Sequence, residues 1–141
     1  MKAKPFLLVI VALLASGRCA AANSTPATAA EPAPAAESFE LRPGEKATVA
    51  DGELVVTFVG VVEDSRCPKG EQCIQAGRVR LSFEATRRGG QPVRFVLDSS
   101  RESDAGVEGF QIDLVSVQPV RIAAGPISPG DYVAKVSIRP L

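Results

Sequence analysis

Apolar and polar residues alternate with a period of two along most of the chain from residue 39 onward. The alternation is clearest in four segments, which are residues 79–84, 93–98, 110–114 and 132–139. A period of two is typical of a β-strand that has one face on a core and the other face in water. No run of a dozen residues has the period of 3.6 that marks an amphipathic helix. The sequence therefore predicts an all-β domain.

Turn signals divide this part of the chain into short strands. Arg87-Arg88-Gly89-Gly90 is typical of a hairpin turn, and Asp51-Gly52 of a second tight turn. Further strand candidates lie at residues 39–41, 47–50 and 54–62. The segment 54–62 is apolar on both faces, which favours a central strand.

Two polar or Gly- and Pro-containing segments, 99–109 and 123–130, are expected to be loops. Six or seven short strands between residues 39 and 141 predict an antiparallel β-sandwich. A small β-barrel is the alternative. Either fold would make 39–141 the single folded domain of the chain.

The N-terminal segment has the composition of a secretory signal peptide. Lys2 and Lys4 precede an apolar run at residues 6–15, and small residues follow up to Ala22. An apolar run of this length is too short to cross a bilayer, which takes roughly 20 residues. We therefore expect residues 1–22 to direct export to the periplasm or cell envelope.

Two processing routes remain open for this signal. Small residues at 20–22 fit cleavage before Asn23, which would release a free periplasmic or secreted protein. Alternatively, Cys19 could carry a lipid, since Leu14-Ala15-Ser16-Gly17 is similar to the start of a lipobox, although Arg18 departs from the small residue usual before the cysteine. Contact with a membrane is expected only through such an anchor on Cys19.

Residues 23–38 are expected to form an extended, disordered tether. The segment consists mostly of Ala, Pro, Thr and Ser and has few large apolar side chains. Such a composition cannot offset the conformational entropy lost on folding. The predicted organisation is thus a signal peptide at 1–22, a tether at 23–38 and a β domain at 39–141.

Charge and residue usage exclude several classes of function. The chain has 16 basic and 16 acidic residues, and removal of the three basic residues of the signal leaves 13 basic residues, a net charge of −3. This balance gives no support for nucleic-acid binding, which needs a concentrated basic patch. The absence of His removes the usual base of Ser and Cys nucleophiles. We expect no enzyme activity and no cofactor.

Cys67 and Cys73 are expected to form a disulfide. They are the two cysteines of the predicted domain, and a pair with five residues between them in an oxidising compartment is most simply a bridge. A structural zinc site would need four ligands from Cys and His, and this chain offers two thiols and no His. We therefore expect a disulfide and no metal site.

The segment around these cysteines resembles a family of uncharacterised exported bacterial proteins, many of them described only as lipoproteins. The resemblance rests on Asp64-Ser65-Arg66-Cys67-Pro68, on Cys73 and on Ala76-Gly77. It extends to Arg42-Pro43-Gly44-Glu45 and to Asp131-Tyr132, and so spans most of the domain. Members often have an aromatic residue where this chain has Gln75. The resemblance implies export and no established activity.

Two accounts of this segment remain open. In the structural account, Asp64 and Ser65 cap turns, and Arg66 pairs with Glu63 or Asp64. In the functional account, the stapled loop is a recognition surface. The candidate interaction residues are then Asp64, Arg66, Lys69 and Gln75.

The function expected from these patterns is a non-catalytic domain that binds an envelope protein partner or has a structural role. A sandwich of the protease-inhibitor or small-ligand-binding type is the alternative. The partner's identity and the oligomeric state are not specified by any pattern in the sequence.

Overall fold

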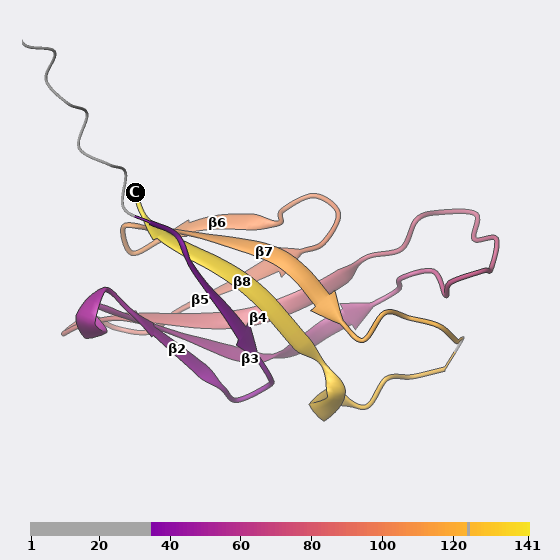
Figure 1. Cartoon of the computed structure of the whole chain (residues 1–141), viewed down its shortest axis with the longest axis horizontal. Coiled ribbons are helices and arrows are strands. Elements are labelled where there is room, and N and C mark those ends of the chain that lie inside the picture. The colour runs from indigo at the N-terminus through magenta and orange to yellow at the C-terminus, as the bar shows by residue number, and fades with distance from the viewer. Residues whose placement is uncertain (1–34, 124) are drawn as a thin grey trace, which may run out of the picture. The chain divides into compact units, whose positions relative to one another are not determined.

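Two four-stranded antiparallel β-sheets pack face to face in the computed structural model, which describes residues 35–123 and 125–141 (Figure 1). The first strand begins at Glu37, within the last two residues of the range expected to be tether. The expected signal peptide, both of its processing sites and most of the tether lie outside the described residues. No helix in the described ranges is long and apolar enough to cross a bilayer.

One sheet has the order β1 (Glu37–Leu41), β8 (Val133–Pro140), β7 (Phe110–Gln118) and β6 (Asp104–Val107). The other has the order β2 (Lys46–Val49), β3 (Leu54–Asp64), β4 (Val79–Arg87) and β5 (Val93–Asp98). Two short 3₁₀ helices, Ala50–Gly52 and Pro129–Asp131, precede β3 and β8. The predicted sandwich is confirmed, and the alternative of a closed barrel is wrong.

The described residues contain eight strands, because β6 lies inside the segment 99–109 that was expected to be a loop. This strand has four residues, of which only Ala105 and Val107 are apolar, so its period of two is a weak signal. It forms because Glu108 and Gly109, with φ of 52° and 82°, make a tight turn that pairs Val107 with Phe110. Two consecutive residues with positive φ are typical of the two-residue hairpin turn that suits the twist of β-strands.

The core fills the space between the sheets with the apolar side chains of the alternating pattern. Phe58 and Phe83 are fully buried, and their ring centroids lie 5.0 Å apart. Phe95 stacks on the other side of Phe83 at 5.7 Å. Stacked rings at these distances add to the free energy gained by burying their area. Each of the three rings comes from a different neighbouring strand, so the stack also fixes the register of β3, β4 and β5.

Three β-bulges interrupt the longest strands. Register shifts occur at Val59 and Val62 in β3 and at Val115 in β7, and all three side chains are exposed. A bulge leaves one residue unpaired and bends its strand. The bulges help to explain why the segment 54–62 is apolar on both faces: Val56 and Phe58 are buried in the core, whereas Val59 and Val62 are the unpaired, exposed residues.

One end of the sandwich holds the start of β1 and the C-terminus, and the other end holds two long loops. At one end, the pairs Glu37–Ile138 and Phe110–Pro140 place the first described residues beside the C-terminus. At the other end, the pairs Asp64–Val79 and Gln118–Val133 project the β3–β4 and β7–β8 loops away from it (Figure 1). The chain therefore enters the domain at the end opposite these loops.

Candidate functional site

The β3–β4 loop (residues 65–78) and the β7–β8 loop come from different sheets and meet at the same end of the sandwich (Figure 1). The backbone N–H of Lys69 donates a hydrogen bond to the carbonyl of Arg121 at 2.8 Å, so the two loops lie side by side. The predicted interaction segment is thus one half of a composite surface.

One carboxylate, that of Asp64, lies at the centre of the contact between the loops. Its side chain is 7% exposed and accepts hydrogen bonds from Nε and Nη2 of Arg66 at 2.9 and 2.7 Å. The hydroxyl of Tyr132, which precedes β8, donates to the same carboxylate at 2.9 Å. A bidentate arginine and a hydroxyl satisfy most of what a buried carboxylate requires.

Two arginines extend this network to the β7–β8 loop. Nη1 of Arg66 donates to the carbonyls of Val117 and Pro119 at 3.3 and 3.1 Å. Nη1 of Arg121 donates to the backbone carbonyl of Asp64 at 2.8 Å and lies 3.8 Å from its carboxylate. Asp64, Arg66, Arg121 and Tyr132 form a polar cluster that we call the Asp64 clamp. The clamp joins the two sheets where the hydrophobic core ends.

The protonation states within the clamp follow from these contacts. Burial alone would raise the pKa of Asp64, but hydrogen bonds from Arg66 and Tyr132 and the charge of Arg66 outweigh it and lower the pKa to about 2. Burial and the hydrogen bond to Asp64 raise the pKa of Tyr132. Asp64 is therefore an ionised structural group near neutral pH and holds no proton for acid catalysis.

The predicted disulfide is confirmed. Cys67 and Cys73 are joined with an S–S distance of 2.00 Å and a Cα–Cα distance of 6.0 Å. A disulfide is compatible with an exported protein. The described residues contain no group of three or more His, Cys, Asp or Glu side chains that could hold a metal ion.

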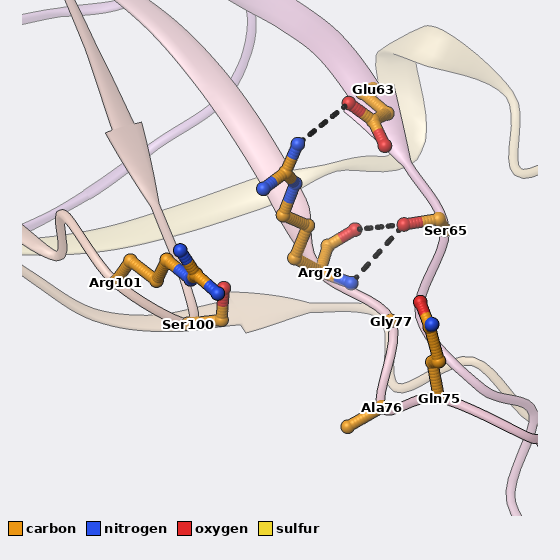
Figure 2. A pocket seen from close by; sticks show the side chains of 8 residues that line it. All are labelled: Glu63, Ser65, Gln75, Ala76, Gly77, Arg78, Ser100 and Arg101. Carbon is orange, nitrogen blue, oxygen red and sulfur yellow. Dashed lines mark hydrogen bonds and ion pairs between the residues drawn. The ribbon is translucent and has the colours of Figure 1, made fainter.

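The base of the stapled loop is closed by backbone contacts at Gly77. A Cβ at this position would lie 1.5 Å from the backbone oxygen of Ser65, so only glycine fits. Ser65 N–H donates to the Arg78 carbonyl at 2.8 Å, and Arg78 N–H donates to Oγ of Ser65 at 3.2 Å (Figure 2). Steric contact with Ser65 therefore explains why the family-like Ala76-Gly77 pair has a glycine at position 77.

A cleft of about 420 Å³ lies beside this base, between the β3–β4 and β5–β6 loops (Figure 2). Its lining is mostly polar and is made by Glu63, Ser65, Gln75, Ala76, Gly77, Arg78, Ser100 and Arg101. Gln75, one of the predicted interaction residues, lines this cleft.

Apolar side chains are exposed on the loops as well. Ile74, next to Cys73, is fully exposed, and Val120 and Ile122 are 54% and 76% exposed. Val120 and Ile122 flank Arg121, whose carbonyl accepts the hydrogen bond from Lys69, and Ile74 belongs to the same loop as Lys69. We call residues 65–78 and 119–123 together the tip of the domain.

The four predicted interaction residues divide into two groups. The side chains of Asp64 and Arg66 turn inward into the clamp, which is the arrangement of the structural account. Lys69 and Gln75 are exposed. Sequence reasoning missed Arg121 and the hydroxyl of Tyr132. The signal available for Tyr132 was the family-like Asp131-Tyr132 pair, and its contact with Asp64 becomes visible only in the fold.

Comparisons with known proteins provide no relative. No family model matches the chain, and neither a curated protein nor a solved structure matches it. The site must therefore be interpreted from its own geometry.

Proposed function

We propose that this chain is an exported, non-catalytic domain that binds a protein partner through its tip. The observation that carries the proposal is the contrast between the rigid base of the tip and its surface. The base is fixed by the disulfide and the Asp64 clamp, yet the surface exposes Ile74 completely and Ile122 by 76%. Fixing a loop before binding reduces the conformational entropy lost when the complex forms.

Export is part of the same proposal. It is supported by the signal-like composition of residues 1–22 and by a disulfide on an exposed loop. Processing before Asn23 would leave the protein free in the periplasm, and lipidation of Cys19 would hold it at the envelope. In both forms the chain enters the domain at the end opposite the tip.

Exposed apolar side chains are common on proteins when they are scattered singly. The tip differs because three of them stand on two adjacent loops whose backbones are joined by a hydrogen bond. Well-packed apolar side chains surrounded by polar residues are typical of the residues that contribute most to protein–protein affinity. Lys69, Glu71 and Gln75 are exposed polar residues of the same loop as Ile74.

Site-specific photo-crosslinking in cells of the native host tests this function. A photoreactive amino acid replaces Ile74 or Ile122, and in a matched control it replaces Leu141, which is 75% exposed at the opposite end. We expect discrete crosslinked species from positions 74 and 122 and none from position 141. Equal or no crosslinking at the three positions would contradict the proposal.

A further inference from the structure

The cleft in Figure 2 places two guanidinium groups from different loops on one polar cavity. Arg78 is the last residue of the β3–β4 loop, immediately before β4, and Arg101 belongs to the loop between β5 and β6. Against these two cations the lining has one acid, Glu63. The cleft adjoins the stapled loop through Gln75, Ala76 and Gly77.

A buried carboxylate positions both sides of this cleft. The side chain of Asp98 is 8% exposed, and its Oδ1 accepts hydrogen bonds from N–H and Oγ of Ser100, both at 2.8 Å. Its Oδ2 lies 3.4 Å from Nε of Arg78. Asp98 thus holds the residue before Arg101 and orients the side chain of Arg78.

The β5–β6 loop is fixed by backbone contacts as well. Asp98 N–H donates to the carbonyl of Glu102 at 2.7 Å, which closes the loop on itself. Ser99 N–H donates to the Val79 carbonyl, and Val79 N–H donates to Oγ of Ser99, each at 3.0 Å. Arg101 is therefore presented from a loop whose backbone is anchored to β4.

The charges around the cleft leave Arg101 available. The carboxylate of Glu63 forms two loose ion pairs, with Nη2 of Arg78 at 3.7 Å and with Nη1 of Arg80 at 3.9 Å. The carboxylate of Asp98 is buried beneath the loop. Within residues 35–123 and 125–141, Arg101 makes no ion pair or side-chain hydrogen bond, and it is exposed. A ligand in the cleft therefore meets one unpaired guanidinium and a second that is only loosely paired.

We infer that this cleft binds a carboxylate of an acidic peptide segment of the partner. The inference rests on the proposed function and adds the chemistry that the partner must present. Guanidinium groups recognise planar carboxylates through paired N–H donors, and hydrogen bonds between two charged groups are stronger than neutral ones. Glu63 at the rim disfavours a ligand of high negative charge density, which argues for a peptide carboxylate over a polyanion.

The test is an NMR titration of the ¹⁵N-labelled mature protein with a short Asp/Glu-containing peptide and with its Asn/Gln counterpart. We expect the acidic peptide to shift the Nε–Hε signals of Arg78 and Arg101 and the amide signals of residues 75–78, more strongly at low than at high ionic strength. Arg101→Gln should weaken binding about tenfold, and Arg101→Glu should abolish it. Arg94→Gln is the matched control, because Arg94, in β5, is also exposed but does not line the cleft.

Three results would overturn the inference. They are equal shifts with both peptides, equal loss of binding in the Arg94 control, and binding of acetate as tight as that of the peptide. Because Arg101 is exposed, its variants should keep the melting temperature of the parent protein. Failure of this titration together with crosslinking at position 74 would remove only the carboxylate site. Peptide binding without crosslinking at the tip would instead remove the proposed function.

Discussion

Asp64, the last residue of β3, connects the two loops that form the tip. Its carboxylate and backbone carbonyl accept hydrogen bonds from Arg66 in the β3–β4 loop and from Arg121 and Tyr132 in the segment between β7 and β8. Removal of one partner from a buried ion pair is costly because the remaining charge stays desolvated. The clamp therefore makes the position of the tip depend on a few charged side chains.

The lowered pKa of Asp64 makes stability depend on pH. Its pKa is about 2 in the folded protein and 3.8 as the ordinary value. The ionised form is favoured by folding, so its contribution is fully present above pH 4 and is lost as the pH falls toward 2. That contribution is on the order of 1–2 kcal/mol. In Asp64→Asn, we expect a lower free energy of unfolding at pH 7 and a flatter pH dependence between pH 4 and 2, measured by urea denaturation. An unchanged pH profile would mean that another carboxylate causes the acid sensitivity.

Arg66 and Lys69 should differ sharply in their effect on stability. Arg66 is the main counter-charge of Asp64 and is 18% exposed, whereas the side chain of Lys69 is exposed. We expect Arg66→Ala to cost about 3 kcal/mol and Lys69→Ala to stay within about 0.5 kcal/mol of the parent. Thermal and chemical denaturation compare the two variants directly. Similar stabilities would show that the clamp contributes little to folding.

The partners of Asp64 could be predicted only in part from the sequence. Arg66 lies two residues away, so its pairing with Asp64 was one of two local alternatives. Tyr132 is 68 residues away and Arg121 is 57 residues away. Tyr132 opens the alternating segment 132–139 at an apolar position and is buried, but the alternation gives no information about its hydroxyl. Long-range polar contacts depend on which loops share an end of the sandwich.

The strands themselves were largely predictable because each buries one face. The alternation identified β4, β5, β7 and β8, and the apolar segment 54–62 corresponds to most of β3. The missed strand, β6, has only Ala105 and Val107 facing the core and depends on the Glu108–Gly109 turn. Strand order and the bulges could not be predicted, because both depend on pairing between segments distant in sequence.

The disulfide should act on one element rather than on the whole fold. It closes a short loop, for which the entropy of the unfolded chain gives a stabilisation of about 2 kcal/mol. The Asp64 clamp and the contacts at Gly77 hold the two ends of the same loop independently. We expect Cys67→Ser with Cys73→Ser to retain the fold, with a lower melting temperature and faster amide exchange confined to residues 66–76. Faster exchange throughout β3 and β4 would show that the staple supports the sheet itself.

At the scale of the whole molecule, two distant parts of the family-like pattern come together. Asp64 to Pro68 and Asp131-Tyr132 meet in the clamp, and Arg42 to Glu45 form the turn that carries the chain from β1 to β2. The backbone of this turn pairs with Phe58 through Gly44 and Glu45. Structural roles thus account for much of the pattern, while the resemblance to an exported family stays a prediction.

The opposite placement of the N-terminal entry and the tip determines how the domain would carry a mechanical load. Tension applied between the tip and the start of β1 at Glu37 would act on opposite ends of the sandwich. That pull acts along β1, which pairs antiparallel with β8 from Glu37–Ile138 to Leu41–Ala134. Hydrogen bonds between strands run perpendicular to this direction, so tension loads these pairs together in shear instead of opening them one after another. β1, the first strand of the domain, is thereby arranged as the part that resists extension.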